Sequence, residues 1–263
     1  MSNALEGVLQ RDKLIVLAAL SAAAVLAWAY IAWLAHGMSS TGAMGDAMAP
    51  MSMPWTQADF VFTFVMWTVM MVGMMTPSVA PMILLYARVG RQAASHGAPL
   101  AATGWFAAGY FLAWTLFALI AAGAQGALQR AALLTPMLSS ASAAVGGVIL
   151  VSAGVLQWTP LKDACLRQCQ APMQFIQSHG GFRADALGSL RIGFLHGGYC
   201  IGCCWALMAL LFVGGIMNVL WIAGLAIIVL LEKSIPGRWL PRLTGTALIG
   251  LGLWMLAGQP LPI

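Results

Sequence analysis

Residues 192–231 read IGFLHGGYCIGCCWALMALLFVGGIMNVLWIAGLAIIVLL, forty residues in a row without Asp, Glu, Lys or Arg. A membrane-spanning helix needs roughly 20 mostly apolar residues, so a single helix of this length would overshoot the bilayer. The sequence Gly214–Asn218 in the middle of the run is typical of a tight turn. We therefore predict two membrane helices here, over Ile192–Val213 and Met217–Leu231.

The rest of the chain has the same apolar character. Of its 263 residues, 61% are hydrophobic and 7% are charged, and the mean hydropathy is +0.89. So few polar side chains cannot cover a soluble globule. The scarcity of charge also excludes an acidic enzyme core, a nucleic-acid module and a disordered tail protein. The composition therefore predicts an integral membrane protein.

Uncharged apolar runs recur along the whole chain and predict seven membrane helices. The runs are Leu14–Ala35, Phe60–Tyr86, Thr103–Gln125, Leu138–Trp158, Ile192–Val213, Met217–Leu231 and Leu243–Leu256. The first run is longer than the apolar part of a secretory signal peptide, so we expect it to be retained. The predicted fold class is an all-α polytopic membrane protein with about seven transmembrane helices.

The basic residues predict the orientation of these helices. With the N-terminus inside, eleven of the twelve Lys and Arg residues fall on the cytoplasmic side, and Arg130 alone falls outside. The C-terminus is then outside. If the first helix is set aside, the other six form two sets of three, an arrangement that allows an inverted 3+3 repeat as in many transporters.

The predicted helices divide the chain into three parts. Residues 1–35 are an N-terminal tail with the first helix, residues 36–59 a Met-rich outer loop, and residues 60–263 a six-helix membrane domain. The outer loop is either a collecting surface for a metal or a solvated linker. Within the membrane domain, residues 159–191 are predicted to form a cytoplasmic loop that carries Cys165 and Cys169 on an amphipathic segment.

All five cysteines lie between residues 165 and 204, which indicates a local site and not a disulfide framework. In the fifth predicted helix, His196, Cys200 and Cys204 recur every four residues and share one face, with Cys203 beside them. Thiolate and imidazole ligands suit Cu(I) or zinc. A single buried cysteine is usually inert, but three thiols and an intramembrane histidine on one face favour a metal or redox site.

The second predicted helix carries thioethers, which are also soft ligands for Cu(I). Its methionines form two adjacent stripes, which contain the candidate ligands Met70, Met71, Met74 and Met75. Methionine is also a common filler of apolar interiors, so packing is the alternative. Pro77 and Pro81 in the same helix remove backbone donors, which is tolerated in a membrane where a bundle or cavity satisfies the freed carbonyls.

Cys165 and Cys169 share a face if their segment is helical, and neighbouring basic residues favour the thiolate form. On the cytoplasmic side a disulfide is not expected to persist. The pair is then an inner metal site, a relay to the intramembrane site or a transient dithiol, unless it has no role. Glu232 either forms a neutralising pair with Lys233 at the interface or lines a cation site.

Four separated motifs occur in order along the chain. They are Met66–Met82, Thr159–Cys169, His196–Trp205 and the segment that begins with Met217-Asn218 and ends with Leu231-Glu232-Lys233. Together they resemble the bacterial family of predicted metal-binding integral membrane proteins, over roughly Phe60 to Pro236. The resemblance implies a multi-span fold in the bacterial inner (cytoplasmic) membrane and metal binding, and it implies no reaction.

The leading hypothesis is a metal-binding membrane protein that handles copper by binding, transfer or transport, with zinc as the alternative metal. The predicted metal ligands are His196, Cys200, Cys203, Cys204, Met70, Met71, Met74, Met75, Cys165 and Cys169. The alternatives are a membrane thiol-redox protein and a subunit or metalloenzyme component of a larger membrane complex. The expected partners are the lipid bilayer, a metal ion, and a membrane or periplasmic protein or a second copy of this chain. No nucleic acid is expected.

Overall fold

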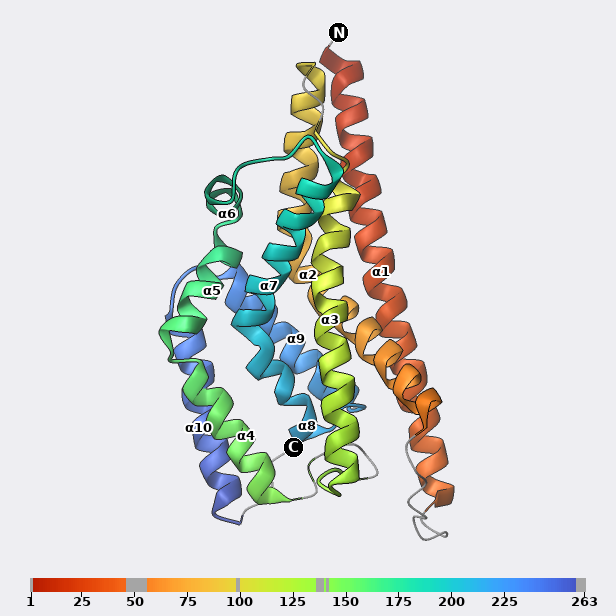
Figure 1. The fold of residues 1–263 in the computed structure, drawn as a ribbon, viewed down its shortest axis with the longest axis vertical. Helices are drawn as coiled ribbons and strands as arrows, with labels where there is room; N and C mark the ends of the chain where they lie inside the picture. Colours follow the sequence, from red (N-terminus) through yellow and green to blue (C-terminus); the bar gives the residue numbers. More distant parts are fainter. Residues whose placement is uncertain (1, 46–55, 98–99, 136–139, 141, 259–263) are drawn as a thin grey trace.

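The computed structural model describes residues 2–45, 56–97, 100–135, 140 and 142–258, with the side chains of these residues except 2–13 and 38–45. The described residues form helices and no strand (Figure 1). The helices are α1 (Ser2–Gly45), α2 (Gln57–Ser95), α3 (Thr103–Arg130), α4 (Ala143–Leu156), α5 (Pro160–Gln170), α6 (Pro172–Ser178), α7 (Ala186–Ala209), α8 (Leu211–Gly214), α9 (Val219–Ser234) and α10 (Trp239–Leu256).

Each of the seven predicted runs overlaps helix in the described residues, but the helices differ in length. Four segments of the described chain are long and apolar enough to cross a membrane: Leu14–Gly37, Gln57–Ser95, Thr103–Arg130 and Ala186–Gly214. Helices α4 and α5 form a fifth if they count as one span bent by 66°. Helices α9 and α10 are shorter, with 16 and 18 residues. The all-helical class is confirmed, with four to five candidate spans, whereas these helices support neither the count of seven nor the orientation.

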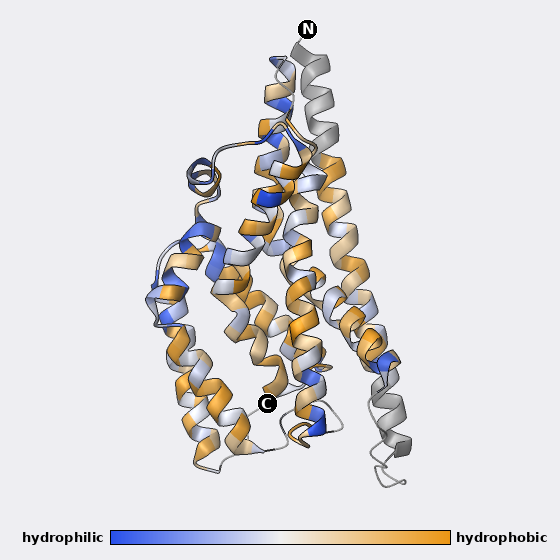
Figure 2. Cartoon of the chain, in the orientation of Figure 1, coloured by the Kyte–Doolittle hydropathy of each residue, from blue (hydrophilic) through white to orange (hydrophobic). Residues whose placement is uncertain are grey.

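The outer faces of the helices are apolar. Large hydrophobic side chains stand exposed on separate helices, among them Leu26 on α1, Ile120 on α3 and Leu220 on α9. Figure 2 shows that hydrophobic residues make up most of the long helices and that hydrophilic ones gather near the helix ends and on α5 and α6. Apolar surface on this scale marks contact with lipid or with a partner.

The turn predicted at Gly214–Asn218 is present between α8 and α9. Gly215 has a φ of 94°, a backbone conformation that a residue with a side chain rarely adopts. The N–H of Asn218 donates to the carbonyl of Gly215 at 3.1 Å. The Asn218 side chain then caps α9 by accepting from the N–H of Trp221. The apolar run of residues 192–231 is therefore divided at the predicted place.

The predicted loops contain more helix than the sequence suggested. Helix α1 continues to Gly45, so residues 36–45 of the Met-rich segment are helical, and residues 46–55 lie outside the described residues. The predicted cytoplasmic loop, residues 159–191, contains α5, α6 and the first turns of α7. The division into three parts stays a prediction.

The helices pack through small residues, which lets their backbones approach closely. A Cβ atom added to Gly193 on α7 would collide with the backbone carbonyl of Phe106 on α3, and one added to Gly109 would collide with that of Leu190. Helices α4 and α10 meet in the same way, since a Cβ on Gly154 would stand 2.7 Å from the carbonyl oxygen of Gly245. Small residues at helix contacts are typical of membrane bundles. This packing fixes α7 against α3 and so positions the cysteine-bearing face of α7.

The close contact between α3 and α7 predicts a difference between two glycines on the same helix. Gly193→Ala should destabilise the protein by about 1–3 kcal/mol, because the added methyl group overpacks a backbone contact. Gly198→Ala is the matched control, since no heavy atom lies within 4 Å of the added Cβ. It should be neutral or stabilising by up to about 1 kcal/mol through helix propensity. Thermal unfolding of both variants in detergent measures the difference, and equal melting temperatures would contradict it.

Candidate metal centre

Helix α7 presents the predicted ligand face to the interior. Asp185 starts the helix by accepting the N–H of Gly188 at 2.6 Å. The residues of the predicted face are nearly inaccessible: His196, Cys200, Cys203 and Cys204 are between 2% and 4% exposed. The helical spacing therefore places all four side chains inside the protein.

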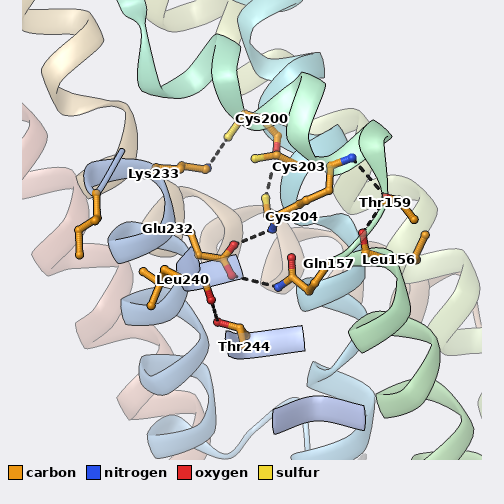
Figure 3. A network of polar contacts seen from close by, with 12 residues as sticks. Leu156, Gln157, Thr159, Cys200, Cys203, Cys204, Glu232, Lys233, Leu240 and Thr244 are labelled. Carbon is orange, nitrogen blue, oxygen red and sulfur yellow. Dashed lines mark hydrogen bonds and ion pairs between the residues drawn. The ribbon is translucent and has the colours of Figure 1, made fainter. Parts of the chain in front are cut away.

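The thiol of Cys200 lies at the centre of the polar contacts. Lys233 on α9 points its ammonium nitrogen Nζ at the Cys200 sulfur, 2.8 Å away (Figure 3). The hydroxyl of Tyr110 on α3 lies 2.9 Å from the same sulfur. Three helices, α3, α7 and α9, thus converge on one sulfur atom.

The same ammonium also reaches helix α2. Lys233 Nζ lies 3.3 Å from the hydroxyl oxygen of Ser78 and 3.7 Å from the thioether sulfur of Met75. Lys233 is 8% exposed, so this positive charge is held inside the bundle. Burying a charge is costly unless other groups compensate it. Here those groups are a thiol, a thioether and a hydroxyl, which together form a site for one cation among sulfur atoms.

Glu232 does not neutralise Lys233, contrary to the pair suggested by their adjacency. Its carboxylate accepts from Lys162 Nζ at 2.6 Å and from Gln157 Nε2 at 3.0 Å. Gln170 also donates to the backbone carbonyl of Glu232 at 2.7 Å, which ties α5 to the end of α9. Successive residues on a helix point about 100° apart. Glu232 therefore faces α4 and α5 while Lys233 faces the thiols.

The cysteines of α5 join those of α7. Thr159 and Pro160 start α5 in the manner of a helix cap with proline at the first position. Cys169 lies close enough to interact with the thiols of Cys200 and Cys203. Cys165 lies against Gly202, where a Cβ would stand 2.8 Å from the Cys165 sulfur. All five cysteines are free and converge from two helices.

The thiols of Cys203 and Cys204 are turned toward the backbone of their own helix. They donate to the carbonyl oxygen of Cys200 at 3.1 Å and 2.9 Å. Among the described residues there is accordingly no group of three or more His, Cys, Asp and Glu side chains arranged to hold a metal ion. Rotation about the Cα–Cβ bond would redirect each thiol, because cysteine has three staggered rotamers. The metal role of the ten predicted ligands stays a prediction.

The four candidate methionines of α2 are buried, with exposed fractions of at most 2%. The sulfur of Met75 lies near Lys233 and 3.9 Å from the Ser78 hydroxyl oxygen. Met70, Met71 and Met74 belong to the hydrophobic core of the described residues. The structure thus brings Met75 to the cysteines and does not show polar contacts for the other three.

His196 lies one helical turn before Cys200. Its Nδ1 atom is buried and finds no hydrogen-bond partner among the described residues. The ring packs against three aromatic side chains, those of Phe106, Tyr110 and Phe175. A buried nitrogen without a partner is uncommon and calls for an explanation.

Sequence reasoning missed Lys233 and Tyr110 as neighbours of Cys200, and Ser78 as a neighbour of Lys233. Lys233 ends an apolar helix and follows an acidic residue, so it resembles an interfacial pair. Its place near the end of a predicted membrane helix was a usable signal, because ionisable residues at membrane depth usually mark a site. Nothing in the sequence distinguishes Tyr110 from other polar residues in the apolar runs, whereas Ser78 lies on the same helical stripe as Met75.

No curated protein and no solved structure matches the chain. A family model does match it, that of the PpoB2 family, described as a copper chaperone, over residues 64–255. The match extends from α2 to α10 and contains all ten predicted ligands. The description supports copper as the metal and gives no support to the zinc alternative. The chain belongs to the PpoB2 copper chaperone family.

Proposed function

We propose that this chain is an integral membrane protein that binds Cu(I) at its buried sulfur atoms and passes it to a partner. The family supports copper handling. The observation that carries the proposal is the ammonium of Lys233, which contacts both the Cys200 sulfur and the Met75 sulfur. A position that accepts a cation among soft donors has the chemistry that Cu(I) requires.

Cys200 and Met75 are the first ligands under this proposal. They come from different helices, α7 and α2, and both lie within reach of one cation. Cys169, Cys203 and Cys204 complete the set when their thiols rotate toward that position. Thiolate and thioether ligands select Cu(I) because harder ions gain little from them.

The placement in the membrane is part of the proposal. Seven helices cross the bilayer, with α9 and α10 short, and the N-terminus is on the inner side of a bacterial inner membrane. Exposed apolar faces and the position of the basic residues along the chain support this topology. An inverted repeat would pair α2 with α7, since each begins one set of three helices and each contributes a sulfur ligand.

A thiol-redox protein is the second candidate, and one observation favours it. Cys169 on α5 lies close to Cys200 and Cys203 on α7. Cys169 and either of these cysteines form a dithiol that can exchange with a disulfide of another protein. A mixed disulfide trapped on Cys200 or Cys203 with a partner would support this function. Stable Cu(I) binding under reducing conditions supports the first candidate.

Replacing Cys200 should remove most of the copper affinity. We expect Cys200→Ser to weaken Cu(I) binding by more than about 100-fold, beyond the loss typical of outer-shell residues, because a hydroxyl is a poor ligand for Cu(I). The measurement is competition with a chromogenic Cu(I) chelator, on purified protein in detergent, under anaerobic reducing conditions. Wild-type protein that retains no Cu(I) would overturn the proposed function.

Substitutions of two methionines on α2 distinguish copper ligation from packing. Met75→Leu should weaken Cu(I) binding by about tenfold, equivalent to about 1.4 kcal/mol. Met66→Leu is the control, because Met66 is also buried on α2 and belongs to the hydrophobic core. It should leave the affinity unchanged, since leucine and methionine have similar volumes. Equal effects of the two substitutions would assign Met75 to packing.

Lys233 should oppose copper binding, because its charge occupies the position of the ion. We expect Lys233→Leu to tighten Cu(I) binding by about tenfold, since like charges a few ångströms apart repel strongly in a protein interior. Lys233→Arg keeps the charge and should bind Cu(I) no more tightly than the wild type. Weaker binding by Lys233→Leu would show instead that the ammonium balances an anionic copper–thiolate group.

A further inference from the structure

A pocket opens between the end of α6 and the first turns of α7. Its volume is about 460 Å³, and His179, Arg183, Arg191 and Leu195 form part of its wall. His179 is the residue that ends α6. The sequence offers no spacing signal for this histidine, and its position becomes informative only in the folded protein.

The two ring nitrogens of His179 have different surroundings. Nδ1 lies 2.8 Å from the carbonyl oxygen of Phe175 and 3.0 Å from the hydroxyl of Ser178. Nδ1–H can donate to the carbonyl, which leaves Nε2 unprotonated, so that it can accept from a hydroxyl or bind a metal. Nε2 is 3.5 Å from the hydroxyl of Tyr199. Metal-binding histidines commonly have one nitrogen fixed by a carbonyl in this way.

His196 contacts the same aromatic ring, that of Phe175. The Phe175 ring stacks on His179 with centroids 4.4 Å apart and meets the His196 ring edge-on at 4.9 Å. Phe175 is fully buried, and His196 is 4% exposed. The unpartnered Nδ1 of His196 is therefore a second available nitrogen, one helical turn from Cys200.

We propose that His179 and His196 form the path by which Cu(I) moves between this pocket and the sulfur atoms, with the Phe175 ring separating the two steps. This inference rests on the proposed function. Cu(I) stays in one oxidation state throughout: a bond to the incoming carrier breaks as a bond to His179 Nε2 forms, and His196 and then Cys200 replace it. The thiol proton of Cys200 leaves to solvent as its sulfur binds the ion. Neutral imidazoles bind Cu(I) and release it to a thiolate, the softer ligand.

The geometry also explains why histidine suits these two positions. A neutral imidazole carries no charge into the apolar interior, whereas a thiolate or carboxylate there would need a counter-ion. Passage past Phe175 requires its ring to move, because the ring contacts both histidines. The path therefore leads Cu(I) through two weak binding positions, at His179 and His196, to a strong one at Cys200.

The rate of copper loading tests the path. Full-length protein in detergent is mixed with a chromogenic Cu(I)–bicinchoninate complex, and the loss of colour is followed by stopped flow. His179→Phe keeps an aromatic ring on Phe175 and removes the nitrogen. This substitution should slow copper loading by at least about tenfold. The final affinity for Cu(I) should equal that of the wild type, because Cys200 and Met75 are intact.

The matched control is His96→Phe. His96 is an exposed histidine that ends α2, and its Nδ1 lies 2.7 Å from the carbonyl oxygen of Gln92, so it repeats the local geometry of His179 away from the pocket. His96→Phe should load at the wild-type rate. Loading by His179→Phe at the wild-type rate would overturn the path, and so would an equal slowing in both variants.

A double variant tests whether the two histidines act in series. His179→Phe with His196→Phe should load no more slowly than the slower single variant, because both residues lie on one route. Rate losses that multiply would show two independent effects and overturn the path. If His179→Phe does not fold, His179→Gln serves in its place, with the melting temperature as the check on folding.

The failure of this inference and of the proposed function are distinguishable. Wild-type protein that binds no Cu(I) contradicts the proposed function and, with it, the path. Wild-type protein that binds Cu(I) at Cys200, with loading unaffected by His179→Phe, contradicts the path alone.

Discussion

The contact between the Lys233 ammonium and the Cys200 sulfur, 2.8 Å long, is the interaction on which the described site depends. A charge buried this far needs compensating groups, and the helices around it provide them. Tyr110 on α3 approaches the same sulfur, and Met75 on α2 approaches the same ammonium. Four helices, α2, α3, α7 and α9, thus meet around this contact.

The buried ion pair between Glu232 and Lys162 supports this arrangement. Glu232 is engaged by Lys162 and Gln157, so the carboxylate next to Lys233 in the sequence is not available to it. The same pair docks α5 against the end of α9, and α5 carries Cys165 and Cys169 to the thiols of α7. Removing one partner of a buried ion pair is costly, because it leaves the other charge uncompensated. One ion pair therefore supports both the cation position and the convergence of the cysteines.

Much of the fold and part of the site could be predicted from local pattern. The break at Gly215 follows from its neighbours, and the shared face of His196, Cys200 and Cys204 follows from the helical period. The count of seven spans went beyond what the helix lengths support, since α9 and α10 are short. Met71 and Met75 lie on one stripe in the sequence, yet only the latter reaches a polar partner in the described structure. A stripe identifies a face, and it does not identify which residue on that face meets another helix.

The sequence by itself determined the helical class, the apolar exterior and the order of the ligand-type residues, because these depend on composition and on spacings of three or four residues. The tertiary structure alone decided which of Glu232 and Lys233 faces the thiols, that Met75 joins Cys200, and that His179 approaches His196 through Phe175. The contact of Lys233 with Met75 joins residues 158 positions apart. Such contacts follow from how helices pack, and no local period in the sequence encodes them.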